Sequence, residues 1–404
     1  MSSFAEATDR MTIDELHRRG SLKWTRGGPG VLGAFVAEMD FGTAPAVEAA
    51  LRGVMERQEY GYLSDQASAD LTRACADWQH SAYGWKVDPA RVWPMPDVFQ
   101  CLAAVITVFS RPGSPVILPT PAYMPFVGLP GQLGRELIQV PMVPGPDGRL
   151  TLDAGAIDAA FRAGGHLLVL INPCNPVGRV YSSSELIAVA EVVERNGGRV
   201  FADEIHSPLV YPGGQGHVPY ASVSATAAGH AITAVAASKA WNLPGLKCAQ
   251  LILSNDADAA IWTGHWSFYE HGPSTPGVRA SAAAYRDGEG WLSEVVSYLD
   301  DSRRLLADLI AEHLPGVGYT PPEGTYLAWL DCRALALSPT APPGRLYPEP
   351  PPDLAEFFRS RAGVLVTDGA LCGDAGRGFL RLNFATPRPV LTEMIRRMGT
   401  ALIG

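Results

Sequence analysis

Short apolar runs alternate with amphipathic stretches through the middle of the chain. Five of these runs are predicted to be strands buried on both faces: 115–118, 166–171, 199–202, 232–237 and 249–253. Helical patterns lie between them, and one of these begins near Ser183 and ends at Asn196, just before two glycines. This alternation predicts an α/β fold in which helices sandwich a mostly parallel central sheet.

The two ends of the chain show different patterns. Residues 1–49 are expected to be irregular apart from a short helix over 11–19, which a capping box from Thr12 to Glu15 would start. A long amphipathic helix is predicted over 289–314, and a few strands and helices follow it. We therefore expect a large domain over 50–288 and a smaller α+β domain that combines 1–49 with 289–404.

One biased segment interrupts the second half of the chain. Seven prolines fall within 339–352, a composition typical of polyproline or irregular loop. We interpret the segment as a surface insertion, with a lid or a subunit contact as the alternative.

Composition narrows the classes of partner. The 404 residues carry 32 Lys and Arg against 41 Asp and Glu, a net charge of −9. This balance argues against nucleic acid, because phosphate binding needs a basic face. The chain has neither an apolar run of the roughly 18 residues that a membrane span needs nor a secretory signal. Six scattered cysteines favour neither a zinc site nor a disulfide scaffold. We expect a cytoplasmic protein with reduced thiols and no metal or membrane partner.

A glycine-rich hexapeptide, from Gly28 to Gly33, fits the GxGxxG pattern of dinucleotide-binding proteins by letter. That pattern has meaning only after a strand and at the start of a helix. Polar residues (SLKWTR) precede it here and Pro29 lies inside it. We therefore do not expect an NAD site at this segment.

Lysine is rare in this chain, which contains four: Lys23, Lys86, Lys239 and Lys247. Lys239 follows an apolar run, where an amine is costly to desolvate unless it is held as an imine or has a lowered pKa. Ser238 and Lys247, on either side of a Pro-Gly turn, could hold a phosphate. If this segment is considered alone, the simpler interpretation is that Lys239 lies at a strand end and points to solvent.

Two polar residues upstream also follow predicted strands. Asp203 ends the run over 199–202, and Asn175 lies in a Pro-rich turn after the run over 166–171. Ligands bind at the carboxyl ends of parallel strands. Each residue alone could be a helix cap or a turn residue, but their order with Lys239 favours one shared site.

Several motifs together resemble those of fold-type I pyridoxal-phosphate enzymes of the class I/II aminotransferase superfamily. They are NPCNPVGR, ADEIH and SKAWNLPGLK. Within that superfamily the chain is similar to cystathionine β-lyase-type C–S lyases, a group that includes the maltose-regulon modulator. That similarity lies in VAEMDF, the Gly61-Tyr62 pair, TPAY, EGTYLAWLD and RLNFATPR. The resemblance covers nearly the whole chain and implies a pyridoxal 5′-phosphate cofactor.

The resemblance implies a role for each matching residue around the cofactor ring. Lys239 would form the Schiff base and, once freed by the substrate, move the Cα proton. Asp203 would pair with the pyridinium nitrogen and make the ring an electron sink. Asn175 would donate a hydrogen bond to the phenolic oxygen, while Tyr123 would stack on one ring face and Ile205 would pack on the other.

Further residues would hold the cofactor phosphate. Ser238 and Lys247 would bind it together with backbone N–H groups near Asp97 and Val98 at a helix start. A carboxylate at Asp97 would repel the phosphate unless it turns away or caps the helix. His206 would also lie at the cofactor, at a position where histidine is usual in the lyase group.

The remaining implied residues concern the substrate and a second subunit. Arg381 would grip the substrate α-carboxylate in a bidentate pair. Tyr62 would reach the phosphate of the neighbouring subunit, which implies a homodimer with shared sites. Two departures from the family, Cys174 in place of a common histidine and Trp241 in place of a common phenylalanine, suggest a reshaped substrate pocket.

The reaction implied by the resemblance is α,β-elimination on an L-cysteine S-conjugate. The substrate would be cystathionine or a larger thioether, even one from a natural product, and the products would be a thiol, pyruvate and ammonia. Three alternatives stay open: an aminotransferase, a decarboxylating or oxidative variant on the same fold, and a regulatory protein that keeps the cofactor site.

Overall fold

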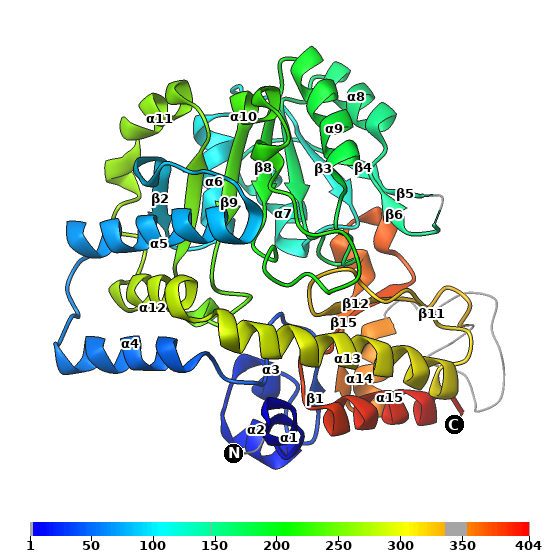
Figure 1. Cartoon of the computed structure of the whole chain (residues 1–404). Coiled ribbons are helices and arrows are strands. Elements are labelled where there is room, and N and C mark those ends of the chain that lie inside the picture. The colour runs from blue at the N-terminus through cyan, green and yellow to red at the C-terminus, as the bar shows by residue number, and fades with distance from the viewer. Residues whose placement is uncertain (1–2, 146, 336–353, 404) are drawn as a thin grey trace.

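The computed structural model describes residues 3–145, 147–335 and 354–403. The proline-rich segment 339–352 lies outside them. Helices surround a large sheet, and a smaller sheet lies beside it with the two chain ends at the same end of the molecule (Figure 1). Along the described residues, no helix is both long enough and apolar enough to cross a bilayer.

The central sheet has seven strands. Their order is β2 (Val92–Met95), β10 (Ala249–Leu253), β9 (Ala231–Val235), β8 (Arg199–Asp203), β7 (Leu167–Ile171), β3 (Val116–Thr120) and β4 (Leu137–Pro141). The strands from β9 to β4 run parallel, whereas β10 is antiparallel to both of its neighbours. The α/β fold with a mostly parallel sheet is thus confirmed.

All five predicted strands are present, but two further strands were not predicted. Strand β2 contains Pro94, and a proline within a run weakens the strand signal. Strand β4 lies at the sheet edge and is largely half-buried, so its apolar pattern is weak. The direction of β10 was not predictable either, because a strand buried on both faces shows the same apolar run whichever way it points.

Helices cover both faces of this sheet. They are α6 (Val98–Val108) and α7 (Met124–Gln132) on one face, and α8 (Ala154–Arg162), α9 (Ser183–Arg195) and α10 (Ala225–His230) on the other. Side chains alternate along each strand, so that on β7 Val169 packs with the first group and Leu168 with the second. This double burial explains the continuous apolar runs in the sequence.

Longer helices lead from the central sheet toward the smaller one. They are α4 (Pro45–Glu56), α5 (Asp65–Tyr83), α12 (Thr275–Asp287) and α13 (Glu289–His313). The shorter α11 (Asp256–Thr263) follows β10 and contacts it. Helix α12 packs on both α4 and α5, and α13 runs alongside α15 (Arg388–Ile403), as Figure 1 shows. The predicted long helix over 289–314 is confirmed by α13.

The smaller sheet is antiparallel. Its order is β11 (Gly318–Tyr319), β12 (Leu327–Asp331), β15 (Phe379–Asn383) and β14 (Thr367–Asp368), with α14 (Leu354–Ala362) and α15 packed nearby. Two short pairs complete the strands: β1 (Leu32–Gly33) with β13 (Val364–Leu365), and β5 (Val143–Pro144) with β6 (Leu150–Thr151). The division into domains near residues 50 and 289 stays a prediction.

The N-terminal segment is more regular than expected. It forms α1 (Phe4–Asp9), α2 (Ile13–Arg18) and α3 (Leu22–Thr25). The predicted capping box of α2 is confirmed: the Glu15 N–H donates to the Thr12 hydroxyl, and the Glu15 carboxylate accepts from the Thr12 N–H. The expectation of irregular chain was wrong for α1 and α3, because helices of four to six residues are too short to show a period.

Candidate active site

A cavity of about 570 Å³ opens where the carboxyl ends of the parallel strands meet the smaller sheet. Every predicted site residue except Tyr62 lines it: Asp97, Val98, Tyr123, Asn175, Asp203, Ile205, His206, Ser238, Lys239, Lys247 and Arg381. The parallel strands β7, β8 and β9 bring three of these segments to one edge of the sheet. Arg381, on β15 of the smaller sheet, meets Asn175 there although the two are 206 positions apart in the chain.

Lys239 lies in the cavity wall, four residues after β9 ends. Its Nζ donates a hydrogen bond to the carbonyl oxygen of Ala37 at 2.9 Å, and the Tyr326 hydroxyl donates to the same oxygen at 2.9 Å. Burial, together with the positive charge of nearby Arg381, lowers the pKa of Lys239 to about 8. The amine therefore loses its proton far more readily than an exposed lysine does.

Asp203 is the last residue of β8, and its side chain is buried. Burial raises the pKa of Asp203 to about 7, although the Ile205 N–H donates to its Oδ1 at 3.1 Å and favours the charged form. A cation seated against this carboxyl would replace the lost hydration and keep it ionised.

Arg381 and Asn175 face each other across the cavity floor. Arg381 Nη1 donates to Asn175 Oδ1 at 3.1 Å, and Nη2 donates to the Phe35 carbonyl at 2.6 Å. The guanidinium is buried, and among the described residues its Nε has no hydrogen-bond partner. The site thus holds a fixed cation with a free donor, which suits a bound carboxylate.

Asp97 and Lys247 form a polar end of the cavity at the start of α6. Asp97 caps this helix, because its Oδ1 accepts from the Gln100 N–H at 2.8 Å. Its Oδ2 lies 3.0 Å from Lys247 Nζ. The sequence allowed the Asp97 carboxylate either to turn away from a phosphate or to cap the helix, and in the structure it caps the helix. The positive charge of Lys247 further offsets the charge of this carboxylate.

Aromatic and imidazole side chains complete the wall. Tyr123 precedes α7, and its ring meets Phe126 edge-on at 5.2 Å. His206 is buried edge-on to Tyr326 at 5.9 Å. Burial lowers the pKa of His206 well below its usual value, and the nearby Lys239 charge adds to the effect. His206 therefore stays neutral at physiological pH.

Tyr62 is the predicted residue that does not reach the cavity of its own chain. Its side chain is 83% exposed, and its ring lies 4.8 Å from that of His271. Its expected contact with a neighbouring subunit stays a prediction.

The two family departures lie away from the cavity. Cys174 is buried in the core with Tyr181, and burial raises the pKa of its thiol to about 12. Trp241 packs edge-on against Trp78 at 5.2 Å, and its Nε1 donates to the Gly288 carbonyl. Neither is among the described residues that line the cavity, so their expected effect on the shape of the pocket stays a prediction. All six cysteines are unpaired and buried, as predicted.

The segment 35–39 contributes part of the cavity wall. Phe35, Val36 and Ala37 line the cavity. Asn383 Nδ2 donates to the carbonyls of Val36 and Glu38 at 2.6 Å each, which anchors the segment to β15. The VAEMDF motif in the sequence could have pointed to this segment. Its contacts with Asn383 were not predictable, because they join residues more than 340 positions apart.

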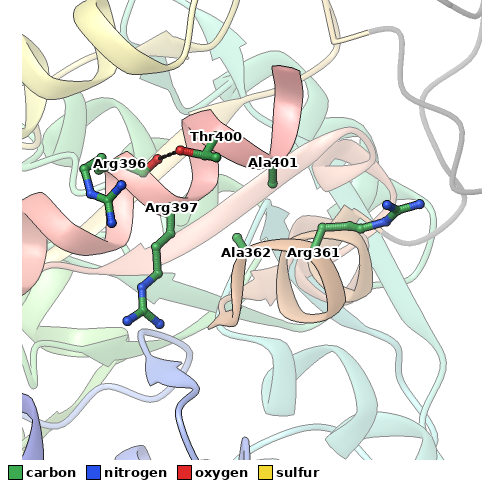
Figure 2. A pocket seen from close by; sticks show the side chains of 6 residues that line it. All are labelled: Arg361, Ala362, Arg396, Arg397, Thr400 and Ala401. Carbon is green, nitrogen blue, oxygen red and sulfur yellow. Dashed lines mark hydrogen bonds between the residues drawn. The ribbon is translucent and has the colours of Figure 1, made fainter. Parts of the chain in front are cut away.

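A second hollow, of about 270 Å³, lies at α14 and α15 (Figure 2). Two of the arginines that line it have partners within the protein: Glu393 pairs with Arg396 and Arg397, and Arg397 Nη1 donates to the Gly30 carbonyl at 3.1 Å. The glycine-rich segment that ends at Gly33 follows helix α3 and leads into strand β1. This order is the reverse of the strand–turn–helix that a dinucleotide phosphate requires.

Comparisons with known proteins agree with this arrangement. The model of the family described as aminotransferase class I and II matches residues 36–398. The cystathionine beta-lyase of Corynebacterium glutamicum is 37% identical, over 96% of this chain and 99% of that protein. The cystathionine beta-lyase PatB of Bacillus subtilis is 30% identical, over 95% and 96%. Cystalysin from Treponema denticola, solved with pyridoxal 5′-phosphate, superposes with a TM-score of 0.88 at 26% identity, over 100% and 99%.

Proposed function

The chain belongs to the class I and II aminotransferase family, and from that premise we propose that it is a pyridoxal-phosphate-dependent C–S β-lyase. Its substrates would be L-cysteine S-conjugates, cystathionine or a larger thioether, and its products a thiol, pyruvate and ammonia. One observation carries the proposal: Lys239, Asp203, Asn175 and Arg381 line the same cavity. The relatives named as cystathionine beta-lyases support the choice of reaction.

The donor set of the cavity fits pyridoxal phosphate. The Lys239 amine, whose pKa is lowered, suits the aldehyde of the cofactor. The buried Asp203 carboxyl suits the ring nitrogen. The N-terminus of α6, flanked by Lys247, suits the phosphate. When bound, the cofactor supplies an aldehyde carbon for amines and a ring that accepts an electron pair.

We assign the proton-transfer step to Lys239. Its amine would hold the cofactor at the aldehyde carbon and would be freed when a substrate amine binds there. With a pKa lowered to about 8, the free amine can accept the proton from the substrate Cα. Asp203 would hold the ring nitrogen of the cofactor and, as a carboxylate, would favour the protonated form of that nitrogen.

We assign substrate orientation to Arg381 and ring positioning to Asn175. The guanidinium of Arg381 binds the substrate α-carboxylate and fixes the Cα–H bond relative to Lys239. Asn175 already accepts from Arg381 through Oδ1, so its Nδ2 is the group that can donate to the ring oxygen. The carboxylate and the ring are thereby set relative to each other.

The bond changes follow from this placement. Lys239 Nζ gains the Cα proton, the Cβ–S bond breaks, and the sulfur leaves with the bonding pair as a thiolate. The three-carbon product takes up water and yields pyruvate and ammonia. No external oxidant or amino acceptor is needed, which separates this reaction from transamination.

We propose in addition that the protein is a cytoplasmic homodimer in which Tyr62 reaches the cofactor phosphate of the neighbouring subunit. The 83% exposure of the Tyr62 side chain supports the second part, since an exposed aromatic at that position is available to another chain. Six buried, unpaired cysteines support the first, since such thiols are typical of a reducing compartment.

The test is direct. Purified holoenzyme is incubated with cystathionine and a panel of S-substituted L-cysteines, and thiol, pyruvate and ammonia are measured. We expect the three products in equal amounts, and none from Lys239→Ala. Product formation that requires an added oxo acid would instead indicate an aminotransferase, carbon dioxide release a decarboxylating variant, and the absence of any turnover a regulatory protein.

A further inference from the structure

Glu204 belongs to the DEIH motif but has no role in the proposed reaction, and the other three residues of the motif line the cavity. It follows Asp203 at the end of β8, and its side chain is 1% exposed. Asp203 lines the cavity, whereas Glu204 is not among the described residues that do so. Its Oε1 accepts from the Tyr220 N–H at 2.7 Å. A buried carboxylate next to a functional one is costly unless it is compensated.

His217 lies against this carboxylate. Its side chain is fully buried, and its Nε2 lies 3.3 Å from Glu204 Oε2. Among the described residues, neither His217 ring nitrogen nor Glu204 Oε2 has a hydrogen-bond partner, so the two side chains meet at ion-pair distance without a formed hydrogen bond. The His217 ring is held edge-on by Tyr83 at 5.0 Å, so it cannot swing away from the carboxylate without losing that packing.

The charges that face Glu204 come from few groups. Within the described residues these are Asp203 on the same strand, Tyr83 at the end of α5 and His217 in the connection after β8. An ionised Glu204 carboxylate without a compensating charge would raise the pKa of both Asp203 and Tyr83. Of the three, His217 is the group that can take a positive charge.

We propose that His217 is a positioning residue that shares one proton with Glu204, so that the pair adds no net charge beside the cofactor-facing carboxyl of Asp203. This inference rests on the proposed function, because it concerns how Asp203 meets a cofactor. Whether the proton resides on the imidazole or on the carboxyl, the pair is neutral overall. Asp203 is then free to stay ionised against a ring cation. Without His217, a second negative charge would favour the protonated form of every nearby group.

The experiment follows the visible absorption band of the bound cofactor in the holoenzyme as a function of pH. His217→Phe keeps the ring packing on Tyr83 but cannot carry the proton. We expect the midpoint of the absorbance change with pH to move upward by about one pH unit, because the variant leaves an added negative charge on Glu204 near the cofactor. The double variant His217→Phe with Glu204→Gln removes the unpaired charge and should restore the wild-type midpoint. Glu204→Gln alone should leave the midpoint where it is, since it removes no net charge from the pair.

A second variant separates proton sharing from hydrogen bonding. His217→Asn can donate a hydrogen bond to Glu204 but cannot share a proton with it. This variant should therefore show the same upward shift. It also serves in place of His217→Phe if the phenylalanine variant does not fold. A wild-type midpoint in both single variants, even with a lower melting temperature, would mean a purely structural role and would overturn the proposal. A shift that persists in the double variant would overturn it as well. If wild-type protein with added pyridoxal phosphate shows no visible band at all, the proposed function itself fails.

Discussion

Arg381 Nη1 lies 3.1 Å from Asn175 Oδ1, and this hydrogen bond joins β15 of the smaller sheet to the loop after β7 of the larger one. The same guanidinium donates to the Phe35 carbonyl at the cavity mouth. A single side chain thus ties together three segments that would surround cofactor and substrate. Its place explains why the site needs both sheets to be folded and docked.

Replacing Arg381 by lysine should impair substrate binding more than the chemical step. A lysine amine cannot donate to Asn175, to the Phe35 carbonyl and to a carboxylate in the same fork geometry. We expect kcat/KM to fall by about 100-fold, or about 2.7 kcal/mol, mainly through KM. Steady-state kinetics on a cysteine thioether measures this. Arg377→Lys is the matched control, because Arg377 is exposed and pairs with Asp374 at the surface. An unchanged KM in Arg381→Lys would contradict the assignment.

Asp97 should tolerate asparagine better than alanine. Asparagine keeps the oxygen that caps α6 and removes the charge that a phosphate would meet, whereas alanine removes the cap. We expect Asp97→Ala to lower the free energy of unfolding by about 1 kcal/mol. Asp97→Asn should keep wild-type stability and bind pyridoxal phosphate at least as tightly. Denaturant unfolding and an equilibrium cofactor titration are the two measurements.

A weaker affinity in Asp97→Asn would show the opposite: that the carboxylate is needed to hold Lys247 in place, 3.0 Å away. The comparison therefore distinguishes a capping role from an ion-pair role at one position.

The rate at which apoprotein takes up pyridoxal phosphate should depend on pH through Lys239. The neutral amine attacks the aldehyde, so the rate rises as the amine loses its proton. Because burial lowers the pKa of Lys239 to about 8 from an ordinary 10.5, the rate should level off just above pH 8. Stopped-flow absorbance of apoprotein mixed with cofactor provides the curve. A rate that keeps climbing well above pH 8 would mean that this amine is solvated like an ordinary lysine.

Lys23 should matter for stability although it lies outside the cavity. Its Nζ is buried 2.8 Å from Asp40 Oδ2, and Trp24 Nε1 donates to the other carboxylate oxygen. Lys23→Met leaves Asp40 without its counter-ion, so we expect a loss of about 3–5 kcal/mol in the free energy of unfolding. Lys86→Met, at an exposed lysine, should change it by less than about 0.5 kcal/mol. Equal effects in the two variants would contradict this account.

Much of the fold was predictable because burial on both faces leaves a clear pattern. The runs that became β3, β7, β8, β9 and β10 are mostly apolar, and the helices between them carry their own start and stop signals. The residues of the cavity were predictable for a different reason: Lys239, Asp203 and Asn175 each follow such a run, and parallel strands bring their ends to one edge.

Sequence by itself therefore determined the secondary structure of the core and the chemical groups at its strand ends, since both depend on neighbours within a few positions. Tertiary structure alone decided the direction of β10, the closure of the cavity by residues 35–39, the cap made by Asp97 and the pairing of Glu204 with His217. These features depend on contacts between residues far apart in the chain or on a choice between equivalent side-chain partners. Local pattern carries no information about either, because the free energy that selects them arises when the packed elements exclude water from their shared surfaces.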